Sequence, residues 1–136
     1  MQLTPLIAVH MTAAIGAIVT GPIALWARKG ATQRPKLHRA FGYAWVTLML
    51  VTAISALFIL DRRLPNIGGY TPIHILVPVT FAGLFGAFYF LAKGNIALHK
   101  KSMQRLYVGA CVIAGLFTLA PSRLVGHFVW SQLGFI

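Results

Sequence analysis

Two histidines at matched positions are the first residues in this sequence whose chemistry suggests a site. His10 precedes Gly30 by 20 residues, and His74 precedes Gly94 by 20 residues. A neutral imidazole can be an axial ligand of haem b, can bind zinc or a transition metal ion, and can donate or relay a proton at a quinone site. The equal spacing therefore predicts that His10 and His74 belong to one cofactor site.

Three further residues extend this candidate site. His127 offers another imidazole, and Arg123 precedes it by one helical turn, where a guanidinium can pair with a haem propionate. Asp61, the single acidic residue, adds a carboxylate for a metal ion. The alternative interpretation is that each histidine lies at a membrane interface and bonds to backbone or lipid headgroups. The candidate cofactor residues are thus His10, His74, His127 and Arg123, and the candidate metal ligands are His10, His74, His127 and Asp61.

The composition places these residues in a membrane protein. The 136 residues are 58% hydrophobic and 10% charged, and 12 Lys and Arg against one acid give a formal charge of +11. That charge suggests nucleic acid, but the cations stand in short clusters between long apolar runs, as they do around membrane spans. No nucleic-acid partner is expected. The lone cysteine, Cys111, excludes a disulfide framework and is interpreted as a small buried hydrophobe.

Four apolar runs are long enough to cross a bilayer, which takes roughly 20 residues at ~1.5 Å each. They predict helices over about 3–27, 40–60, 72–92 and 106–130 in a single domain that covers 1–136. The predicted fold class is an all-α integral membrane four-helix bundle. Prolines in these runs fall near helix ends or where a neighbouring helix can replace the lost backbone bond; they are Pro5, Pro22, Pro72 and Pro78.

The cations predict the direction of the helices. Nine of the 12 lie in the first and third connections, whereas the second has Arg62 and Arg63, partly offset by Asp61. The positive-inside rule then puts the first and third connections in the cytoplasm, and both termini outside a bacterial inner membrane. From the cytoplasmic turns, 20 residues at ~1.5 Å span the ~30 Å hydrocarbon layer. One outer level is therefore expected for His10, His74, His127 and Asp61.

The two halves of the chain look like copies of one helical hairpin. Each half has Thr-Pro before its first helix, Lys-Gly in its turn and Leu-His at the start of its second helix. A bilayer imposes a similar pattern on any two hairpins, which is the alternative explanation. The matched pairs are Thr4-Pro5 with Thr71-Pro72, Lys29-Gly30 with Lys93-Gly94, and Leu37-His38 with Leu98-His99.

Helical faces indicate how the hairpins pack. Small residues continue the His10 face and permit close helix approach, namely Ala13, Ala14, Ala17, Gly21 and Ala24. We expect this stripe to pack against a bulky one that continues the His74 face, formed by Phe81, Phe85 and Phe88. An inner aromatic belt is expected from Tyr43, Trp45, Tyr89 and Tyr107.

A basic cluster at the inner face is the second candidate site. Cations at the start of a helix attract anions, so the phosphates of anionic inner-leaflet lipids are the expected ligands. A sharper hypothesis makes His38 and His99 a second ligand pair in a two-haem conduit. The cluster comprises His38, Arg39, His99, Lys100, Lys101 and Arg105. The sequence has no Gly-rich phosphate loop, cysteine pair or carboxylate pair, and we assign no catalytic residue.

The segments "KLHRAFGYAW" and "GNIALHKKSMQRLY" resemble a family of small bacterial membrane proteins, the domain-of-unknown-function 2306 family. Its hallmark is similar to A-H-R-R-W-M-x-R-x-Y, and the residues that fit are Ala97, His99, Lys100, Met103, Arg105 and Tyr107. Ser102 stands in place of the aromatic residue. More distantly, four helices with histidines at both faces resemble the cytochrome b561 type of membrane haem protein. That resemblance implies electron transfer through haem b, with His10 and His74 as outer ligands.

Three functions remain open. The leading prediction is a cytochrome b561-like electron-transfer protein that binds haem b, an oxidoreductase-type activity if the protein is an enzyme. The alternative is a non-catalytic accessory subunit or assembly factor of a larger membrane complex, or of a homo-oligomer, which the short chain and short connections suit. A third is a metal-binding or transport protein, for which the histidines and Asp61 would have to converge.

Overall fold

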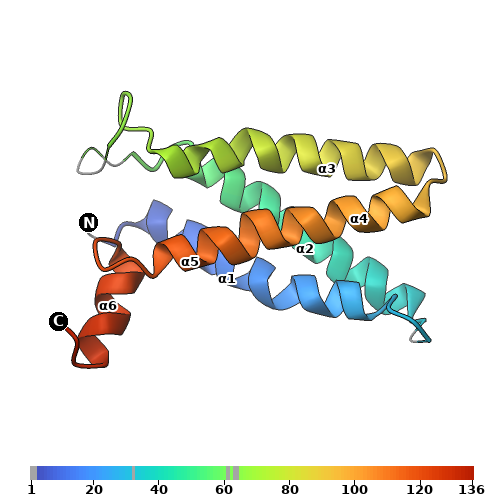
Figure 1. Ribbon diagram of the computed structural model, residues 1–136, viewed down its shortest axis with the longest axis horizontal. Coiled ribbons are helices and arrows are strands. Elements are labelled where there is room, and N and C mark those ends of the chain that lie inside the picture. The colour runs from blue at the N-terminus through green and yellow to red at the C-terminus, as the bar shows by residue number, and fades with distance from the viewer. Residues whose placement is uncertain (1–2, 32, 61, 63–64) are drawn as a thin grey trace.

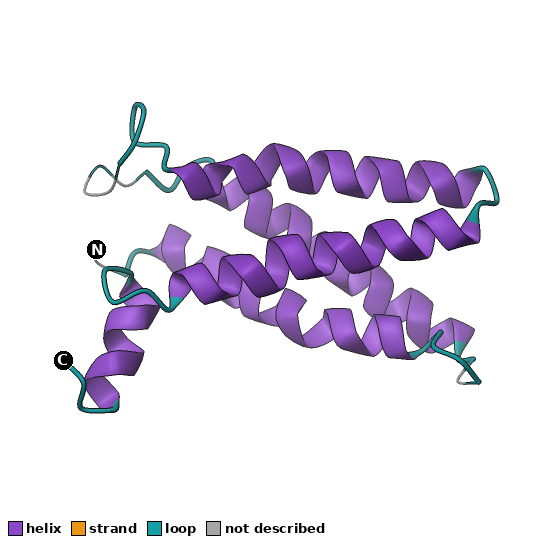
Figure 2. Cartoon of the chain, in the orientation of Figure 1, coloured by secondary structure: helices purple, strands orange, loops and turns teal. Residues whose placement is uncertain are grey.

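The computed structural model describes residues 3–31, 33–60, 62 and 65–136. Nearly all of this part of the chain is helical, and the helices are joined by short turns (Figure 2). Long apolar runs favour helices in a membrane because a helix satisfies its backbone hydrogen bonds internally. The all-α class predicted from the sequence is confirmed.

The first hairpin consists of α1 (Pro5–Trp26) and α2 (Pro35–Ala56). Each helix begins with proline, whose missing N–H costs little there because the first N–H groups of a helix have no helical acceptor. The Thr4 hydroxyl accepts a hydrogen bond from the Ile7 amide at 3.2 Å and caps α1. α2 begins before the predicted boundary at residue 40, so the basic segment around His38 is helical.

The second half begins with a 3₁₀ turn, η1 (Pro72–Ile75), which leads into α3 (Leu76–Ala92). Asn95 then caps the next helix by accepting a hydrogen bond from the Leu98 amide at 3.1 Å. That helix runs without a break and comprises α4 (Ile96–Leu106), the π-helical η2 (Tyr107–Ile113) and α5 (Ala114–Thr118). The chain ends with α6 (Leu124–Gln132).

The two hairpins lie against each other (Figure 1). α1 packs along α2 and α3 along α4, while further contacts join α2 to α3 and α1 to η2. The α1–α2 and α3–α4 connections lie at the same end of the molecule (Figure 1). We call this the basic end, since it holds Arg28, Lys29, Arg34 and Lys93. The opposite end, which we call the outer end after the orientation predicted from the sequence, has the α2–α3 connection and α6.

The predicted fourth helix over 106–130 differs from the structure. The helix begins at Ile96, ends at Thr118, and is followed by a turn before α6 bends away from the other helices (Figure 1). Pro121 explains the break because it lacks an N–H and disfavours helical geometry at the residue before it. The basic residues of α4 thus lie within the helix rather than in a connection.

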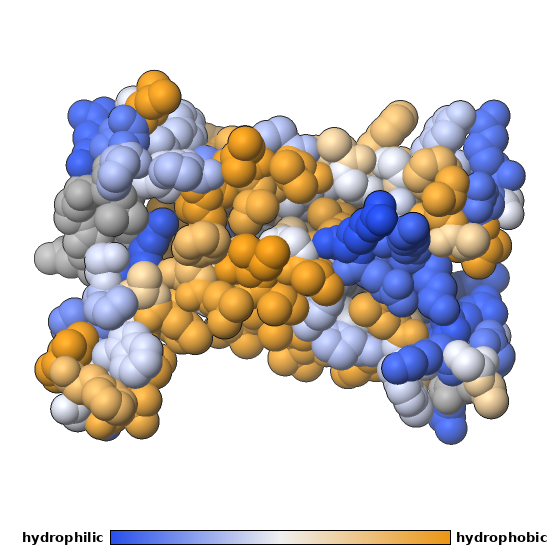
Figure 3. All heavy atoms as spheres, in the orientation of Figure 1, coloured by the Kyte–Doolittle hydropathy of each residue, from blue (hydrophilic) through white to orange (hydrophobic). Residues whose placement is uncertain are grey.

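The surface divides into an apolar middle and polar ends (Figure 3). Among the described residues, three helices are long and apolar enough to cross a membrane: Pro5–Trp26, Pro35–Ala56 and Pro72–Ala92. In the visible face, hydrophilic residues gather at the basic end and extend along α4 (Figure 3). The fourth predicted span, 106–130, is not among the three because its helix ends at Thr118, and the part of that helix before residue 106 carries the cations of α4.

The small-residue stripe of α1 is buried, as predicted, at Ala13, Ala17, Gly21 and Ala24, whereas Ala14 is half-buried. It packs mainly along α2, and Gly21 also lies against Tyr107 of η2. The bulky stripe of α3 instead faces outward, and Phe85 is 76% exposed. A membrane gives no penalty for this arrangement because lipid tails are as apolar as phenylalanine. The predicted pairing of the two stripes is therefore wrong.

Candidate functional site

His10 joins α1 to the end of α2. Its Nδ1 atom lies 3.0 Å from the carbonyl oxygen of Thr52 and 2.9 Å from Oγ of Ser55. A carbonyl oxygen only accepts, so Nδ1 carries the proton and donates it. The Ser55 hydroxyl also donates to the Thr52 carbonyl, at 3.0 Å. The Nε2 atom of His10 then has a lone pair that no described residue uses.

His74 also bonds to the end of α2, but through both ring nitrogens. Its Nδ1 atom accepts the Thr71 amide N–H at 3.1 Å, so the proton is on Nε2. Nε2 lies 2.9 Å from the Ile59 carbonyl oxygen and 3.1 Å from that of Ala56, and donates to them. Helix ends leave carbonyl groups without helical donors, and His74 supplies a donor to the Ile59 carbonyl just beyond α2. The Ala56 carbonyl also accepts the Ile59 amide N–H, at 3.2 Å. The ring has no free nitrogen for a ligand in this arrangement.

The two outer histidines therefore bond to one short stretch of the chain, the last turn of α2 and the residues that follow it. The sequence predicted a shared outer level for His10 and His74, and the structure brings both rings to carbonyls between Thr52 and Ile59. Through these hydrogen bonds the two histidines connect α1 and η1 to the end of α2. Ligation by this pair would require His74 to release its bonds to α2.

The basic end has two histidines with matching geometry. Nδ1 of His38 on α2 lies 2.7 Å from the Ala24 carbonyl oxygen of α1, and Nδ1 of His99 on α4 lies 2.8 Å from the Ala87 carbonyl oxygen of α3. Each histidine is the fourth residue of its helix and donates to the preceding helix of its own hairpin. This shared bond agrees with the duplication predicted from the sequence.

The lone pairs of these two rings remain available. Because Nδ1 donates to a carbonyl, Nε2 of His38 and of His99 is an acceptor, and neither has a partner within the described part of the chain. A histidine that binds a metal through one nitrogen almost always donates the other N–H to a carbonyl or carboxylate. His38, His99 and also His10 have this arrangement. The Phe88 ring lies beside His99, with ring centroids 6.2 Å apart.

The remaining site residues are separate from these. His127 is exposed on α6, where Nδ1 lies 3.5 Å from Oγ of Ser131. Arg123 precedes α6 as its N-cap residue. Asp61 lies outside the described residues. Among the residues that are described, no three His, Cys, Asp or Glu side chains come together as a metal site.

The basic cluster is exposed, as a lipid-binding surface requires. Arg39, Lys100, Lys101 and Arg105 are exposed on α2 and α4, and His38 and His99 are half-buried against their hairpin partners. The histidines and the cations thus differ in character, since the rings offer acceptors and the cations offer donors.

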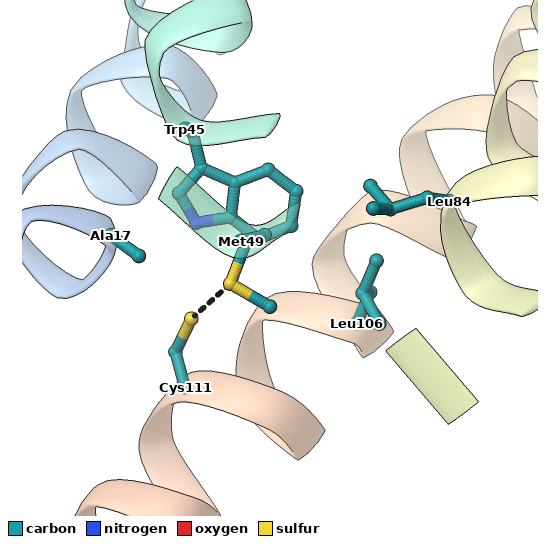
Figure 4. Packing of buried hydrophobic residues seen from close by; sticks show 6 residues of the cluster. All are labelled: Ala17, Trp45, Met49, Leu84, Leu106 and Cys111. Carbon is teal, nitrogen blue, oxygen red and sulfur yellow. Dashed lines mark hydrogen bonds between the residues drawn. The ribbon is translucent and has the colours of Figure 1, made fainter. Parts of the chain in front are cut away.

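A cluster that sequence reasoning missed lies in the interior. Trp45, expected in the aromatic belt, is instead 4% exposed and packs with Met49 and Cys111 (Figure 4). Its indole Nε1 is buried beside the Cys111 thiol, whose sulfur is a weak acceptor for it. The spacing of Trp45 and Met49 by one helical turn was the available signal. Burial of Cys111 is confirmed.

Apolar spanning helices, a basic end and histidine-linked hairpins define a helical integral membrane protein. The chain matches the family model described as predicted membrane protein (DUF2306) over residues 7–132, and it belongs to that family. The predicted family membership is confirmed. Neither the curated proteins nor the solved structures compared with the chain include a match.

Proposed function

We propose that the protein is a membrane electron-transfer protein that binds haem b at its basic end, where His38 and His99 would hold the iron. The observation that carries this proposal is the matched pair of Nδ1 bonds to Ala24 and Ala87, which leaves both Nε2 atoms open. Haem b bound in this way would supply one-electron redox chemistry. The protein's contribution is to fix the tautomer and direction of each ring.

The tautomer favours a metal over a lipid phosphate as the partner of these two rings. A phosphate oxygen needs a hydrogen-bond donor, whereas a neutral ring with its proton on Nδ1 presents a lone pair at Nε2. Iron accepts such a lone pair. The lipid-binding interpretation therefore suits the neighbouring lysines and arginines better than it suits the histidines.

The charges nearby support the same assignment. Haem propionates are anionic, and an arginine or lysine forms a charge-assisted hydrogen bond with a carboxylate. Arg39 follows His38 directly, and Lys100 follows His99 directly. The same cations, with Lys101 and Arg105, would hold anionic lipid headgroups where no propionate is present. The basic end then faces the cytoplasm, with both termini outside.

The outer histidines take a different role in this proposal. His74 gives both nitrogens to backbone groups, so ligation would cost its bonds to the α2 carbonyls. His10 keeps an open Nε2 and is the outer candidate for a proton or quinone contact. A haem held by His10 and His74 is the less supported arrangement.

A visible spectrum tests the proposal. The protein would be expressed with 5-aminolevulinate, purified in detergent and recorded oxidised and dithionite-reduced. We expect a Soret band and a reduced α-band with about one haem per chain, both lost in His38→Ala and in His99→Ala. His127→Ala is the matched control, because that exposed ring lies next to Ser131 of its own helix, and its haem content should be unchanged.

Two outcomes would overturn this assignment. Folded protein without a Soret band would remove haem and leave the accessory-subunit function. Haem that persists in both His38→Ala and His99→Ala but disappears in His10→Ala would move the site to the outer end. A size-exclusion profile and circular dichroism spectrum like those of the wild type would show that each variant is folded.

A further inference from the structure

An apolar groove lies between α2 and α3. The two helices are joined at the outer end, where His74 bonds to the end of α2, and they diverge toward the basic end (Figure 1). The groove has a volume of about 510 Å³, within the ~300–1,000 Å³ range of sites that bind small molecules. It is open on one side, since Phe85 is 76% exposed. Its lining residues are Val46, Leu50, Phe81, Leu84, Phe85, Phe88 and Tyr89.

The groove extends over about one leaflet of a bilayer. Along α3 it runs from Tyr89, near the end of the helix at Ala92, to Phe81. The eight positions from 81 to 89, at ~1.5 Å each, make ~12 Å, which is close to half of the ~30 Å hydrocarbon layer. The groove thus begins near the headgroups at the basic end and ends near the middle of the bilayer. The acyl chain of a lipid in that leaflet has the same range of depth.

Cations from both helices stand at the basic end of this groove. Nζ of Lys93 lies 5.7 Å from the centroid of the Tyr89 ring, which lines the groove. On α2, Arg39 precedes the lining residue Val46 by seven positions, which is two helical turns along one face. Both cations are exposed. The segments that form the basic end contain no acidic residue, so an anion for these cations has to come from outside the chain.

We propose that this groove binds one acyl chain of an anionic phospholipid, with the phosphate beside Lys93 and Arg39. The apolar lining suits the chain, and a phosphate oxygen forms charge-assisted hydrogen bonds with lysine and arginine. A soluble phosphate would leave the groove empty, and a neutral lipid would leave the cations without an anion. An anionic phospholipid satisfies both parts of the site at once.

This site differs from a general attraction of anionic lipids to the basic end. Exposed cations alone attract anionic headgroups and place no constraint on the acyl chains. The groove adds that constraint, because its walls come from two helices. Neither His38 nor His99 is among the described residues that line it, so the lipid site does not depend on the proposed haem.

Native mass spectrometry of the full chain tests this proposal. The protein, prepared without a haem precursor and delipidated in detergent, would be titrated with phosphatidylglycerol or with phosphatidylcholine of the same acyl chains. We expect one phosphatidylglycerol per chain to bind about tenfold more tightly than phosphatidylcholine, since two cations face its headgroup. Glycerol phosphate, which has no acyl chain, should not displace the bound lipid.

Two variants separate the acyl chain from the headgroup. Phe85→Ala removes an exposed wall of the groove and should weaken binding of both lipids severalfold. Lys93→Gln should weaken binding of phosphatidylglycerol by about fivefold and leave that of phosphatidylcholine nearly unchanged. The matched controls are Ile15→Ala, which removes an exposed apolar side chain of α1, and Lys29→Gln, which removes a cation of the α1–α2 connection. Both controls should bind lipid like the wild type.

Equal binding of the two phospholipids by folded wild-type protein would overturn the proposal. Unchanged binding in Phe85→Ala would show that the acyl chain does not lie in the groove, and displacement by glycerol phosphate would show a headgroup site alone. Either result would refute the assignment. Circular dichroism spectra like that of the wild type would show that each variant is folded. Because all four variants keep His38 and His99, the haem assignment can fail in its own spectrum while the lipid site holds.

Discussion

The hydroxyl of Tyr107 lies 3.0 Å from the carbonyl oxygen of Ile18, one residue on η2 and the other on α1. Pro22 follows Ile18 by four positions and has no N–H, so the Ile18 carbonyl lacks its usual helical donor. Tyr107 replaces that donor from a neighbouring helix. Tyr107→Phe should therefore lower the free energy of unfolding by about 0.5–1.5 kcal/mol, measured by SDS titration in mixed micelles.

Pro22 offers the control for this prediction. In a Pro22→Ala background, the new N–H donates to the Ile18 carbonyl within α1. Tyr107→Phe should then lower the free energy of unfolding clearly less than it does in the wild type. The coupling energy of the two changes measures the bond itself. If Tyr107→Phe lowers the free energy of unfolding equally in the two backgrounds, Tyr107 acts through packing alone.

Bilayer physics made part of this architecture predictable. The sequence predicted that a neighbouring helix replaces the backbone hydrogen bond lost at Pro22, because an unpaired carbonyl is costly in lipid. The small stripe of α1 was also correctly expected in an interface. The sequence did not reveal which helix each face meets. Phe85 is exposed on α3, and a membrane does not drive bulky apolar residues inward, so hydrophobicity does not distinguish buried from exposed positions.

The candidate site was predictable in its residues but not in their bonds. Counting along helices correctly brought His10 and His74 to the same end. It could not show that both ring nitrogens of His74 form hydrogen bonds. These bonds depend on how the connection between α2 and α3 folds back against the end of α2. Trp45 was assigned to an interface by residue type, while its burial depends on close packing of α1 and η2 around it.

Gly21 should be intolerant of a side chain. An alanine Cβ there would lie 2.5 Å from two ring carbons of Tyr107, a distance that forces the ring to move. Gly21→Ala should cost about 1–3 kcal/mol, as overpacking of a well-packed core does. Gly86→Ala on α3 is the matched control, because an added Cβ there has no neighbour within 4 Å among the described atoms. That variant should be neutral or slightly stabilising, because alanine favours helix over glycine.

The measurement is thermal unfolding in detergent followed by circular dichroism, with the two variants compared in the same detergent. Similar destabilisation by Gly21→Ala and Gly86→Ala would mean that helix-wide effects, and not the contact with Tyr107, decide the result.

His74 should hold the α2–α3 connection against α2. In His74→Ala, the Ile59 carbonyl loses the His74 donor, the Ala56 carbonyl keeps the Ile59 amide N–H, and the Thr71 amide loses its acceptor. A part-buried group left unpaired costs about 1–3 kcal/mol. Hydrogen exchange of 57–71 should become faster while that of α1 changes little. In His127→Ala, exchange in this connection should stay at the wild-type rate, and faster exchange there would refute the assignment.

The cations of α4 should select anionic lipids at the basic end. Each Lys or Arg near a membrane surface contributes about 1 kcal/mol of attraction, so replacing Lys100, Lys101 and Arg105 together by Gln should remove most of the preference. Quenching of tryptophan by brominated phosphatidylglycerol, relative to brominated phosphatidylcholine, measures this preference. Trp26, half-exposed beside Arg34, is the reporter at the basic end.

The preference for anionic lipids should also depend on the salt concentration. Exposed charges are screened over about 10 Å at 0.1 M and about 3 Å at 1 M ionic strength, so the lipid preference of the wild type should fall as salt rises. Arg62→Gln, which removes one exposed cation at the outer end, should leave the preference at Trp26 unchanged. If the triple variant still prefers phosphatidylglycerol as strongly as the wild type at low salt, the α4 cations do not form the lipid site, and the cations of the α1–α2 connection become the candidates.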